Sequence, residues 1–200
     1  MALRAPTAPL GARRQNRWRF SADQYLALYE TGVMSPDERT ELIDGEIYVV
    51  SPSGPLHASS QVTLTRLFML QQGDRFVVWP DNAIRLGERS LVQPDVALLR
   101  PEPSTYCSRL PGAADVLLAV EVANTSLAHD RRLKLPLYAH HGVPEVWLVS
   151  LPEHRLEVHR DPHGRRYGDV AVLGDGDRAA PLCAPDVEVE VGEVLRVRFR

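Results

Sequence analysis

One stretch of this chain limits its possible folds more than any other: residues 116–123, which read VLLAVEVA. Every residue except Glu121 is apolar, a composition typical of a β-strand that is buried on both faces. A strand of this kind lies at the centre of a sheet, with other strands beside it. The stretch therefore predicts a protein built around a central sheet whose faces are covered by helices.

Helix and strand signals continue on both sides of this strand. Ser21 is expected to cap a helix that ends near Gly32, with Gln24 in the capping-box position. Asp44 and Gly45 stand between apolar pairs and predict a tight β-hairpin. Further helices are expected from residue 35 and at residues 57–72 and 127–141, and further strands at residues 76–79, 83–86, 96–99 and 146–151.

The helix at residues 127–141 contains two residues that affect its course. Pro136 would kink it or stand between two shorter pieces, because proline lacks the N–H that a helix interior needs. Gly142 is expected to end it in a left-handed conformation. From residue 155 the pattern changes to strands separated by turns, at residues 156–160, 167–173, 187–191 and 194–199. We therefore expect an α/β fold with a C-terminal antiparallel β extension.

Residues 1–19 differ from the remainder, because they contain five arginines and no acidic residue, with Pro, Ala and Gly between them. This composition predicts a disordered basic arm, which is either a frayed terminus or an arm that contacts phosphate. We expect residues 20–200 to form a single domain.

The overall composition is typical of a globular protein. The longest apolar run, residues 116–120, is far too short to cross a bilayer. Cys107 and Cys183 have no metal-binding or redox spacing, and no hydrophobic segment follows the N-terminal arginines. These features predict a cytoplasmic protein that makes no membrane contact. The net charge of −3 argues against binding nucleic acid mainly through a basic surface, but it is compatible with handling nucleic acid through a metal.

Two carboxylates occupy positions that a fold alone would not favour. Glu121 interrupts the apolar strand, where an unpaired buried carboxylate is strongly destabilising. Asp95 follows Pro94 directly before the predicted strand 96–99. Each has an alternative explanation. Asp95 would cap a turn, and Glu121 would lie at a strand end in solvent or pair with an arginine.

Lys134 is the only lysine among 23 lysine and arginine residues. Lysine is a compact charge whose pKa moves readily beside other charges, whereas arginine stays protonated. A site that needs such a group would retain lysine in a chain otherwise biased towards arginine. The alternative is a helical ion pair with Asp130, four residues earlier, which contributes only a few tenths of a kcal/mol.

Asp95, Glu121 and Lys134 together predict a reactive site. The two acids stand on neighbouring predicted strands, and the lysine stands on the helix that follows. Carboxylates provide the hard oxygen ligands that suit Mg²⁺ or Mn²⁺. A nearby ammonium can orient a water molecule or neutralise a phosphate. The three residues therefore point to metal-dependent chemistry on a phosphate ester.

These residues also carry a resemblance to a known family. The motifs ELIDGEIYVVSP, QPDVALL and LLAVEVANTS, then D-x-x-x-K-x-x-x-Y followed by GVPEVWLV, occur in an order that resembles the Uma-two family. These bacterial restriction-endonuclease-like proteins belong to the PD-(D/E)XK nuclease superfamily. The resemblance covers about residues 20–158. It implies a restriction-endonuclease-like central mixed sheet flanked by helices, with the active site at one edge of the sheet.

The resemblance assigns roles to individual residues. It implies that Asp95 and Glu121 bind the divalent metal. The superfamily lysine usually stands two residues after the second acid, where this chain has Ala123. Within the family the lysine comes from the following helix, a position that Lys134 matches. The segment ANTS and Ser150 also depart from common family residues, but they remove no proposed ligand.

An acid from the N-terminal region completes the superfamily pattern. Glu41 matches it best, with Asp44 and Glu46 as alternatives, and the hairpin turn explains Asp44 better. His57 matches a family position at the start of a helix, where it lies near the site or caps the helix. Asp130 is a further candidate accessory residue. The other histidines show no zinc-binding spacing.

These inferences lead to one main function and two alternatives. We expect a Mg²⁺- or Mn²⁺-dependent endonuclease that hydrolyses phosphodiester bonds, with DNA as the substrate by family analogy. The alternatives are a non-catalytic interaction or assembly protein on a nuclease-like scaffold, and a nuclease that acts on RNA or branched nucleic acid. Nucleases of this kind often act as dimers, and the sequence leaves open whether this protein is a homodimer.

Overall fold

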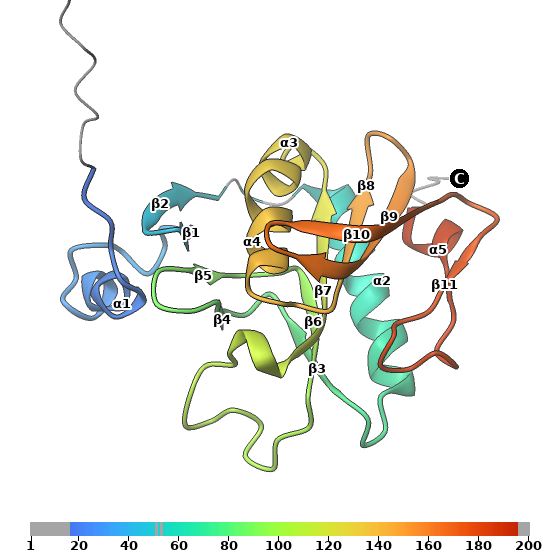
Figure 1. Cartoon of the computed structure of the whole chain (residues 1–200), viewed down its shortest axis with the longest axis horizontal. Helices are drawn as coiled ribbons and strands as arrows, with labels where there is room; N and C mark the ends of the chain where they lie inside the picture. The colour runs from blue at the N-terminus through green and yellow to red at the C-terminus, as the bar shows by residue number, and fades with distance from the viewer. Residues whose placement is uncertain (1–16, 51, 53, 196–200) are drawn as a thin grey trace, which may run out of the picture.

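A six-stranded mixed sheet forms the centre of the computed structural model, which describes residues 17–50, 52 and 54–195 (Figure 1). Its strands are β3 (Val77–Pro80), β6 (Val96–Leu99), β7 (Val116–Ala123), β8 (Glu145–Ser150), β9 (Arg155–His163) and β10 (Arg166–Leu173). They lie in the order β10-β9-β8-β7-β6-β3. β7 and β8 are parallel, and the other neighbouring pairs are antiparallel. The apolar strand at residues 116–123 therefore lies inside the sheet, as its composition predicts.

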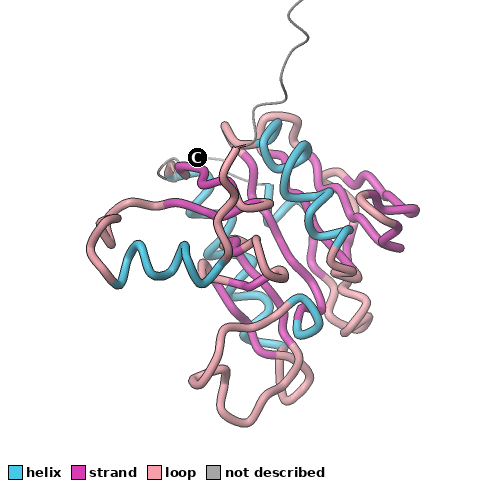
Figure 2. Tube along the Cα trace, turned by 60° about the vertical axis from the view of Figure 1, so that its left-hand side comes forward, coloured by secondary structure: helices cyan, strands magenta, loops and turns pink. Residues whose placement is uncertain are grey.

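Helices cover both faces of this sheet (Figure 2). One face packs against α2 (Pro55–Gln71) and α5 (Val191–Leu195), and the other against α3 (Leu127–His129), η2 (Asp130–Lys134) and α4 (Leu135–His140). On the first face, Leu64 and Phe68 of α2 join the buried cluster that contains Val122. On the second face, Tyr138 of α4 joins the cluster that contains Ala119. The expected architecture, a central mixed sheet flanked by helices, is confirmed.

A second, smaller sheet lies beside the first and carries the predicted hairpin. It contains β1 (Thr40–Ile43), β2 (Glu46–Val49), β4 (Ile84–Arg85) and β5 (Leu91–Val92), in the order β2-β1-β5-β4. Asp44 and Gly45 connect β1 to β2 with φ angles of 49° and 82°, so both turn residues are left-handed, as a two-residue hairpin requires. A Cβ atom on Gly45 would stand 2.7 Å from the Cβ of Arg19. Glycine is therefore needed there for space as well as for conformation.

Helix α1 (Ala22–Glu30) packs on the smaller sheet and begins as the sequence predicts. The Oγ of Ser21 accepts the N–H of Gln24 at 3.1 Å, and Oε1 of Gln24 accepts the N–H of Ser21 at 3.0 Å. This reciprocal capping box satisfies two backbone donors that the first turn leaves free.

The segment η2, between α3 and α4, is wound as a π-helix. The N–H of Leu135 donates to the carbonyl of Asp130, five residues earlier, where an α-helix would use the fourth. Pro136 then stands in the first turn of α4, where its missing N–H costs little. The prediction that Pro136 would lie near a junction of two helical pieces is confirmed, and Gly142 ends the helix at a φ of 73°.

The helix expected from residue 35 is wrong, because residues 35–38 form a turn. The N–H of Glu38 donates to the carbonyl of Ser35 at 3.0 Å, and Oε2 of Glu38 accepts the N–H of Ser35 at 3.1 Å. The N–H of Asp37 donates to Oγ of Ser35. These side-chain hydrogen bonds compete with helical pairing.

The C-terminal antiparallel extension is present, but its last part differs from the prediction. β9 and β10 extend the central sheet, and β11 (Arg178–Ala179) pairs with β12 (Val189–Glu190) in a two-stranded sheet. The strand expected at residues 194–199 is wrong where it is described, because α5 reaches Leu195; residues 196–200 lie outside the described residues. The hydroxyl of Ser60 on α2 donates to the carbonyl of Val194 at 2.8 Å. Packing against α2 thus overrides the β preference of valine.

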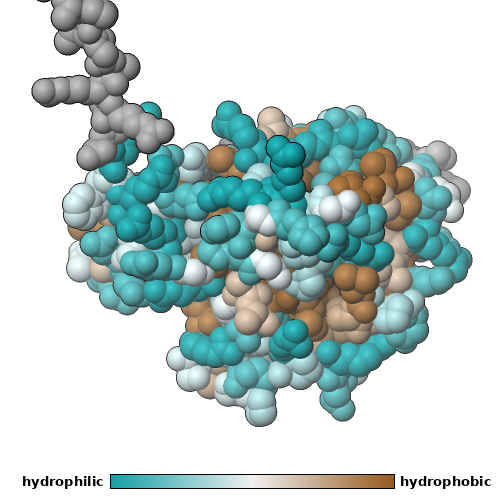
Figure 3. All heavy atoms as spheres, in the orientation of Figure 1, coloured by the Kyte–Doolittle hydropathy of each residue, from teal (hydrophilic) through white to brown (hydrophobic). Residues whose placement is uncertain are grey.

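Most of the predicted basic arm, residues 1–16, lies outside the described residues. Its last residues lie against the hairpin, where Arg17 and Arg19 contact Glu46 at 3.8 and 3.2 Å. Figure 3 shows mainly hydrophilic residues on this side of the molecule, whereas patches of hydrophobic residues lie nearer the centre and right of centre in the same view. Within the described residues, every helix is too short or too polar to span a lipid bilayer.

Candidate active site

A cavity of about 460 Å³ opens where the β1–β2 hairpin meets the adjoining ends of β6 and β7 and the segment η2. Glu41, Asp95, Glu121 and Lys134, the four residues that the sequence suggests, all line it. Each comes from a different element: β1, the residue before β6, the end of β7, and η2. The structure therefore brings together residues that are far apart in the chain.

The pairing of β6 with β7 places two carboxylates side by side. Val96 pairs with Val120, so one further step along both strands sets Asp95 opposite Glu121. Oδ2 of Asp95 accepts the N–H of Val122 at 2.6 Å. Asp95 thus bonds to the neighbouring strand, and this contact differs from the turn cap that was its alternative explanation.

Lys134 joins two of the three acids. Its Nζ lies 2.7 Å from Oε1 of Glu121 and 3.0 Å from Oε1 of Glu41, and its side chain is 5% exposed. Nζ also donates to the carbonyl of Gln93 at 3.3 Å. The ion pairs of Lys134 in the described structure are with these acids, and not with Asp130, so the simple helical pair is not formed.

Among the three acids of the hairpin region, Glu41 is the one that faces the cavity. Its Oε1 accepts the N–H of Gln93 at 2.7 Å, and the residue is 3% exposed. Asp44 serves the hairpin turn, and its Oδ2 pairs with Arg165 at 2.7 Å. Glu46 contacts the hydroxyl of Tyr48 and arginines outside the cavity. The two alternatives to Glu41 therefore lie elsewhere.

The two accessory candidates, His57 and Asp130, also line the cavity. Nε2 of His57 lies 3.0 Å from Oδ1 of Asp95, and its Nδ1 is buried without a hydrogen-bond partner in the described structure. The side chain of His57 thus turns towards Asp95, and the hydrogen bond with Asp95 raises the pKa of the imidazole. Asp130 is buried, and its Oδ2 accepts the hydroxyl of Ser126 at 2.7 Å.

The cavity wall carries more negative charge than its ammonium group can neutralise. Burial raises the pKa of Glu121 well above its ordinary value, and burial also raises the pKa of Asp130. Burial acts to lower the pKa of Lys134, but the carboxylates of Glu121, Glu41 and Asp130 outweigh it and the pKa is raised. Lys134 is therefore protonated and lies among several acids, which it cannot neutralise by itself.

The donor chemistry of the cavity fits a hard divalent cation. The oxygens of Glu41, Asp95 and Glu121 are the ligand type that Mg²⁺ and Mn²⁺ prefer, and their unbalanced charge favours a cation. Within the described residues, no group of three or more acidic, histidine or cysteine side chains is already arranged around a common metal position. The acids instead contact Lys134, His57 and backbone N–H groups. A metal would have to compete with these contacts.

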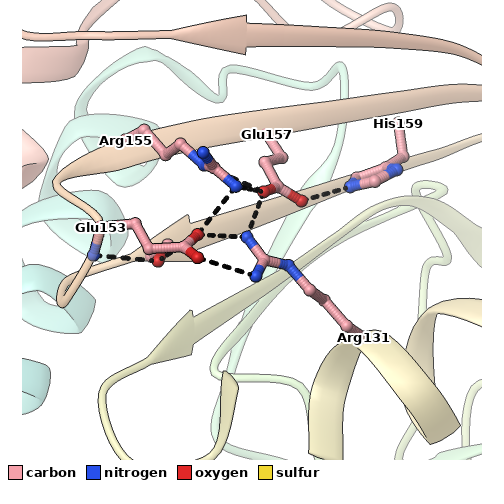
Figure 4. A network of polar contacts seen from close by, with 6 residues as sticks. Arg131, Glu153, Arg155, Glu157 and His159 are labelled. Carbon is pink, nitrogen blue, oxygen red and sulfur yellow. Dashed lines mark hydrogen bonds and ion pairs between the residues drawn. The ribbon is translucent and has the colours of Figure 1, made fainter. Parts of the chain in front are cut away.

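We call Glu41, Asp95, Glu121, Asp130 and Lys134 the Lys134 cluster. A second charged group, the Glu157 cluster, lies next to it on the same face of the sheet and comprises Arg131, Glu153, Arg155, Glu157 and His159 (Figure 4). Arg131, from the same π-helical segment as Lys134, contacts both Glu153 and Glu157. The segment η2 is thereby tied to β9 through one residue while it presents Lys134 to the cavity.

Tyr138 and Arg39 are among the residues of the cavity region that are absent from the sequence-based site. Tyr138 donates its hydroxyl to Oε1 of Glu121 at 2.6 Å, and it is the tyrosine of the D-x-x-x-K-x-x-x-Y motif. Arg39 lines the cavity from the position before β1. Its spacing of two residues from Glu41 was an available signal, because alternate residues of a strand face the same side.

A protein family and a solved structure are similar to this chain. The model of one protein family, Uma2, with the description "Putative restriction endonuclease", matches residues 22–192. The fold is similar to the crystal structure of "a putative nuclease belonging to DUF820" from Anabaena variabilis ATCC 29413, with 15% sequence identity and a TM-score of 0.69. The match covers 88% of this chain and 97% of that chain. No curated protein matches the chain.

Proposed function

Since this chain belongs to the Uma2 family of restriction-endonuclease-like proteins, we propose that it is a metal-dependent endonuclease that hydrolyses phosphodiester bonds in DNA. The observation that carries the proposal is the meeting of Glu41, Asp95 and Glu121 with Lys134 at one cavity. Burying several carboxylates beside one lysine is unfavourable for stability alone, so a function explains it better.

The carboxylates of Asp95 and Glu121, with Glu41 beside them, would hold Mg²⁺ or Mn²⁺. When bound, such an ion polarises the phosphate and lowers the pKa of a water molecule. The family description supports DNA as the substrate, because restriction endonucleases act on DNA. Asp95 is held in place by the N–H of Val122, and Glu121 by the hydroxyl of Tyr138. These bonds restrict the two carboxylates to positions that face the cavity.

The proposed role of Lys134 is to stabilise negative charge on the phosphate as it is attacked. Its ammonium is already charged and positioned by Glu121, Glu41 and the carbonyl of Gln93, so little reorganisation is needed during the reaction. An arginine would be larger and would present a planar fork instead of a compact charge. This difference offers a reason for a lysine at this position.

The proposal is tested by cleavage of supercoiled plasmid with Mg²⁺ or Mn²⁺, comparing the wild type with Glu121→Gln. We expect nicking that depends on metal and is lost in the variant. Glu145→Gln is the matched control, because Glu145 is an equally buried carboxylate of the same sheet that bonds to Arg160, Trp147 and the N–H of Leu182. It should lose stability and keep cleavage. Circular dichroism would verify that each variant is folded.

Other results would favour the other functions. A folded wild type that cleaves no nucleic acid with either metal would support a non-catalytic scaffold that assembles with partners. Cleavage of RNA or of branched DNA in preference to plasmid, measured by competition between the substrates, would keep the metal chemistry and change the substrate. Equal cleavage by the wild type and Glu121→Gln would indicate a contaminating nuclease and overturn the proposal.

A further inference from the structure

The cavity has two cationic side chains among its described lining residues other than histidine: Lys134 and Arg39. They differ in exposure and in partners. The side chain of Lys134 is 5% exposed and held between carboxylates, whereas that of Arg39 is 42% exposed and stands at the cavity mouth. Five acids share the lining, including Asp81 and Asp130. A polyanion that enters this cavity therefore meets mainly negative charge, and Arg39 is a cation that it can reach.

The backbone directs Arg39 into the cavity. Arg39 immediately precedes β1, and its carbonyl accepts the N–H of Val50 at 2.8 Å, which continues the pairing of β1 with β2 by one step. Alternate residues of an extended strand face the same side, so Arg39 shares the side of Glu41. The element that supplies an acid to the site thus also supplies an arginine at its entrance.

Among the residues that the structure describes, the side chain of Arg39 contacts one acid, Asp81. Its Nη2 donates to Oδ1 of Asp81 at 3.0 Å, and both side chains are nearly half exposed. A guanidinium has five N–H donors, and the contact with Asp81 uses one of them. Ion pairs of this exposed, single-contact kind are weak.

Asp81 is hydrogen-bonded to Asp95, one of the proposed metal-binding acids, through the backbone. Its φ is 48°, a left-handed turn conformation directly after β3, and its N–H donates to the carbonyl of Asp95 at 3.1 Å. Asp81 therefore presents a carboxylate beside the proposed metal-binding acid, where it occupies Arg39 and repels an approaching phosphate.

We propose that Arg39 binds a backbone phosphate of the nucleic acid at the cavity mouth, and that Asp81 competes with that phosphate for Arg39. The inference rests on the proposed function and deepens it by assigning a substrate-binding residue and an internal competitor. A phosphate accepts two parallel N–H bonds from a guanidinium, a geometry that the single bond to Asp81 does not use. Binding would exchange a weak contact for a stronger one.

This role makes a prediction that a structural ion pair does not make. If the pair only stabilises the fold, loss of either partner should act in the same direction. If Asp81 competes with substrate, Arg39→Ala should weaken nucleic-acid binding and Asp81→Asn should strengthen it. The double variant Arg39→Ala/Asp81→Asn should stay weak, because the freed arginine is then missing.

The experiment measures the Kd of a short fluorescein-labelled DNA duplex by anisotropy without added metal, together with KM and kcat for cleavage. We expect Arg39→Ala to raise Kd about tenfold and to lower the slope of log Kd against log salt by about one. We expect Asp81→Asn to lower Kd about threefold, and Arg39→Lys to fall between the wild type and Arg39→Ala. The change should be in KM more than in kcat.

The pair Arg75–Asp186 is the matched control, because it is another exposed arginine–aspartate contact, at 2.6 Å and away from the cavity. Arg75→Ala and Asp186→Asn should leave Kd unchanged. Weaker binding by both Arg39→Ala and Asp81→Asn, or no change in either, would overturn the inference alone if the wild type still cleaves DNA with metal. A wild type that neither binds nor cleaves nucleic acid would overturn the inference together with the proposed function.

Discussion

The Lys134 cluster and the Glu157 cluster lie on the same face of the central sheet, yet their charges are balanced differently. In the Glu157 cluster, Arg131 and Arg155 face Glu153 and Glu157, and every one of these side chains has a partner of opposite sign. In the Lys134 cluster, one ammonium faces four acids, of which Glu121 is among the most deeply buried. The five-residue segment η2 supplies one cation to each cluster, Arg131 to the Glu157 cluster and Lys134 to the Lys134 cluster.

The pKa values of the buried carboxylates Glu157 and Glu121 shift in opposite directions. Burial acts to raise the pKa of Glu157, but hydrogen bonds and charge from Arg131 outweigh burial and the pKa is lowered. Burial raises the pKa of Glu121, and Lys134 does not compensate for it. In the first cluster, each acid of the described structure is paired with arginine. In the second, the acids outnumber the lysine, which is the arrangement that the proposed metal would balance.

Removing one cation from each cluster tests this difference most strongly. Lys134→Met should lower the rate of DNA cleavage about 10³-fold, because the charge that stabilises the reacting phosphate is lost. Arg131→Met should change the rate by less than about tenfold, because it touches no proposed reacting group. Rates are measured with plasmid under single-turnover conditions.

Lys134→Arg separates the loss of charge from the loss of shape in that experiment. This variant keeps the positive charge in a larger, planar group, and we expect its rate of DNA cleavage to remain below that of the wild type. Circular dichroism checks the folding of each variant. A rate loss in Arg131→Met as large as that in Lys134→Met would remove the proposed distinction between the clusters.

Metal binding should stabilise the protein through the Lys134 cluster alone. At a hundredfold excess over its Kd, Mn²⁺ should add about 2.7 kcal/mol to the free energy of unfolding of the wild type. Scanning calorimetry should show a higher Tm with metal for the wild type and for Glu157→Gln, and no such rise for Glu121→Gln. A rise in Tm that persists in Glu121→Gln would place the metal elsewhere.

The same substitution in the two clusters should have opposite effects on stability without metal. Glu157→Gln should lower the free energy of unfolding by about 1–2 kcal/mol near neutral pH, because Arg131 and Arg155 lose their shared partner. Glu121→Gln should raise it by about 0.5–1 kcal/mol, because burial disfavours the charged form of Glu121, as its raised pKa shows, and Lys134 keeps Glu41 as a partner. Urea unfolding measures both. A loss in both variants would show that Glu121 also serves stability.

The contribution of Glu157 to the free energy of unfolding should decrease as the pH is lowered. Because the pKa of Glu157 is lowered from the ordinary 4.5, its ionised form stabilises the folded state above that value. The stabilisation is lost as the pH falls below 4.5 through the lowered pKa. The difference in the free energy of unfolding between the wild type and Glu157→Gln should therefore be largest at neutral pH and decrease in acid.

The part of the site that could be predicted came from residues that conflict with their surroundings. Glu121 is an acid within an apolar strand, and Lys134 is a lone lysine among arginines. Both conflicts are visible in composition, and the structure places both residues at the cavity. Local signals also predicted the Asp44–Gly45 hairpin, because few residues adopt a left-handed turn readily.

The remainder depends on contacts that local sequence does not encode. Arg39 is one of many arginines, so composition does not single it out. Its spacing from Glu41 predicts a shared side of the strand, but its contact with Asp81, far away in the chain, follows only from the fold. Residues 191 and 194–195 fall within predicted strands because of their valines, but they lie in the helix α5, which packs against α2. The balance of the Glu157 cluster likewise arises from the alignment of β8 with β9 and from the winding of η2.

The π-helical winding of η2 has a consequence for comparing related sequences. A π-turn accommodates one residue more than the α-helical path between the same two points, so the segment from Asp130 to Leu135 is defined by its length as well as by its residue types. A relative with a one-residue deletion there would follow the α-helical path between the same two points, so its side chains within the segment, but not those after it, would shift by up to about 100°. An alignment that pairs its lysine with Lys134 across such a gap would match two residues that point in different directions. Residue counts through this segment must therefore agree before the role proposed for Lys134 is transferred from one family member to another.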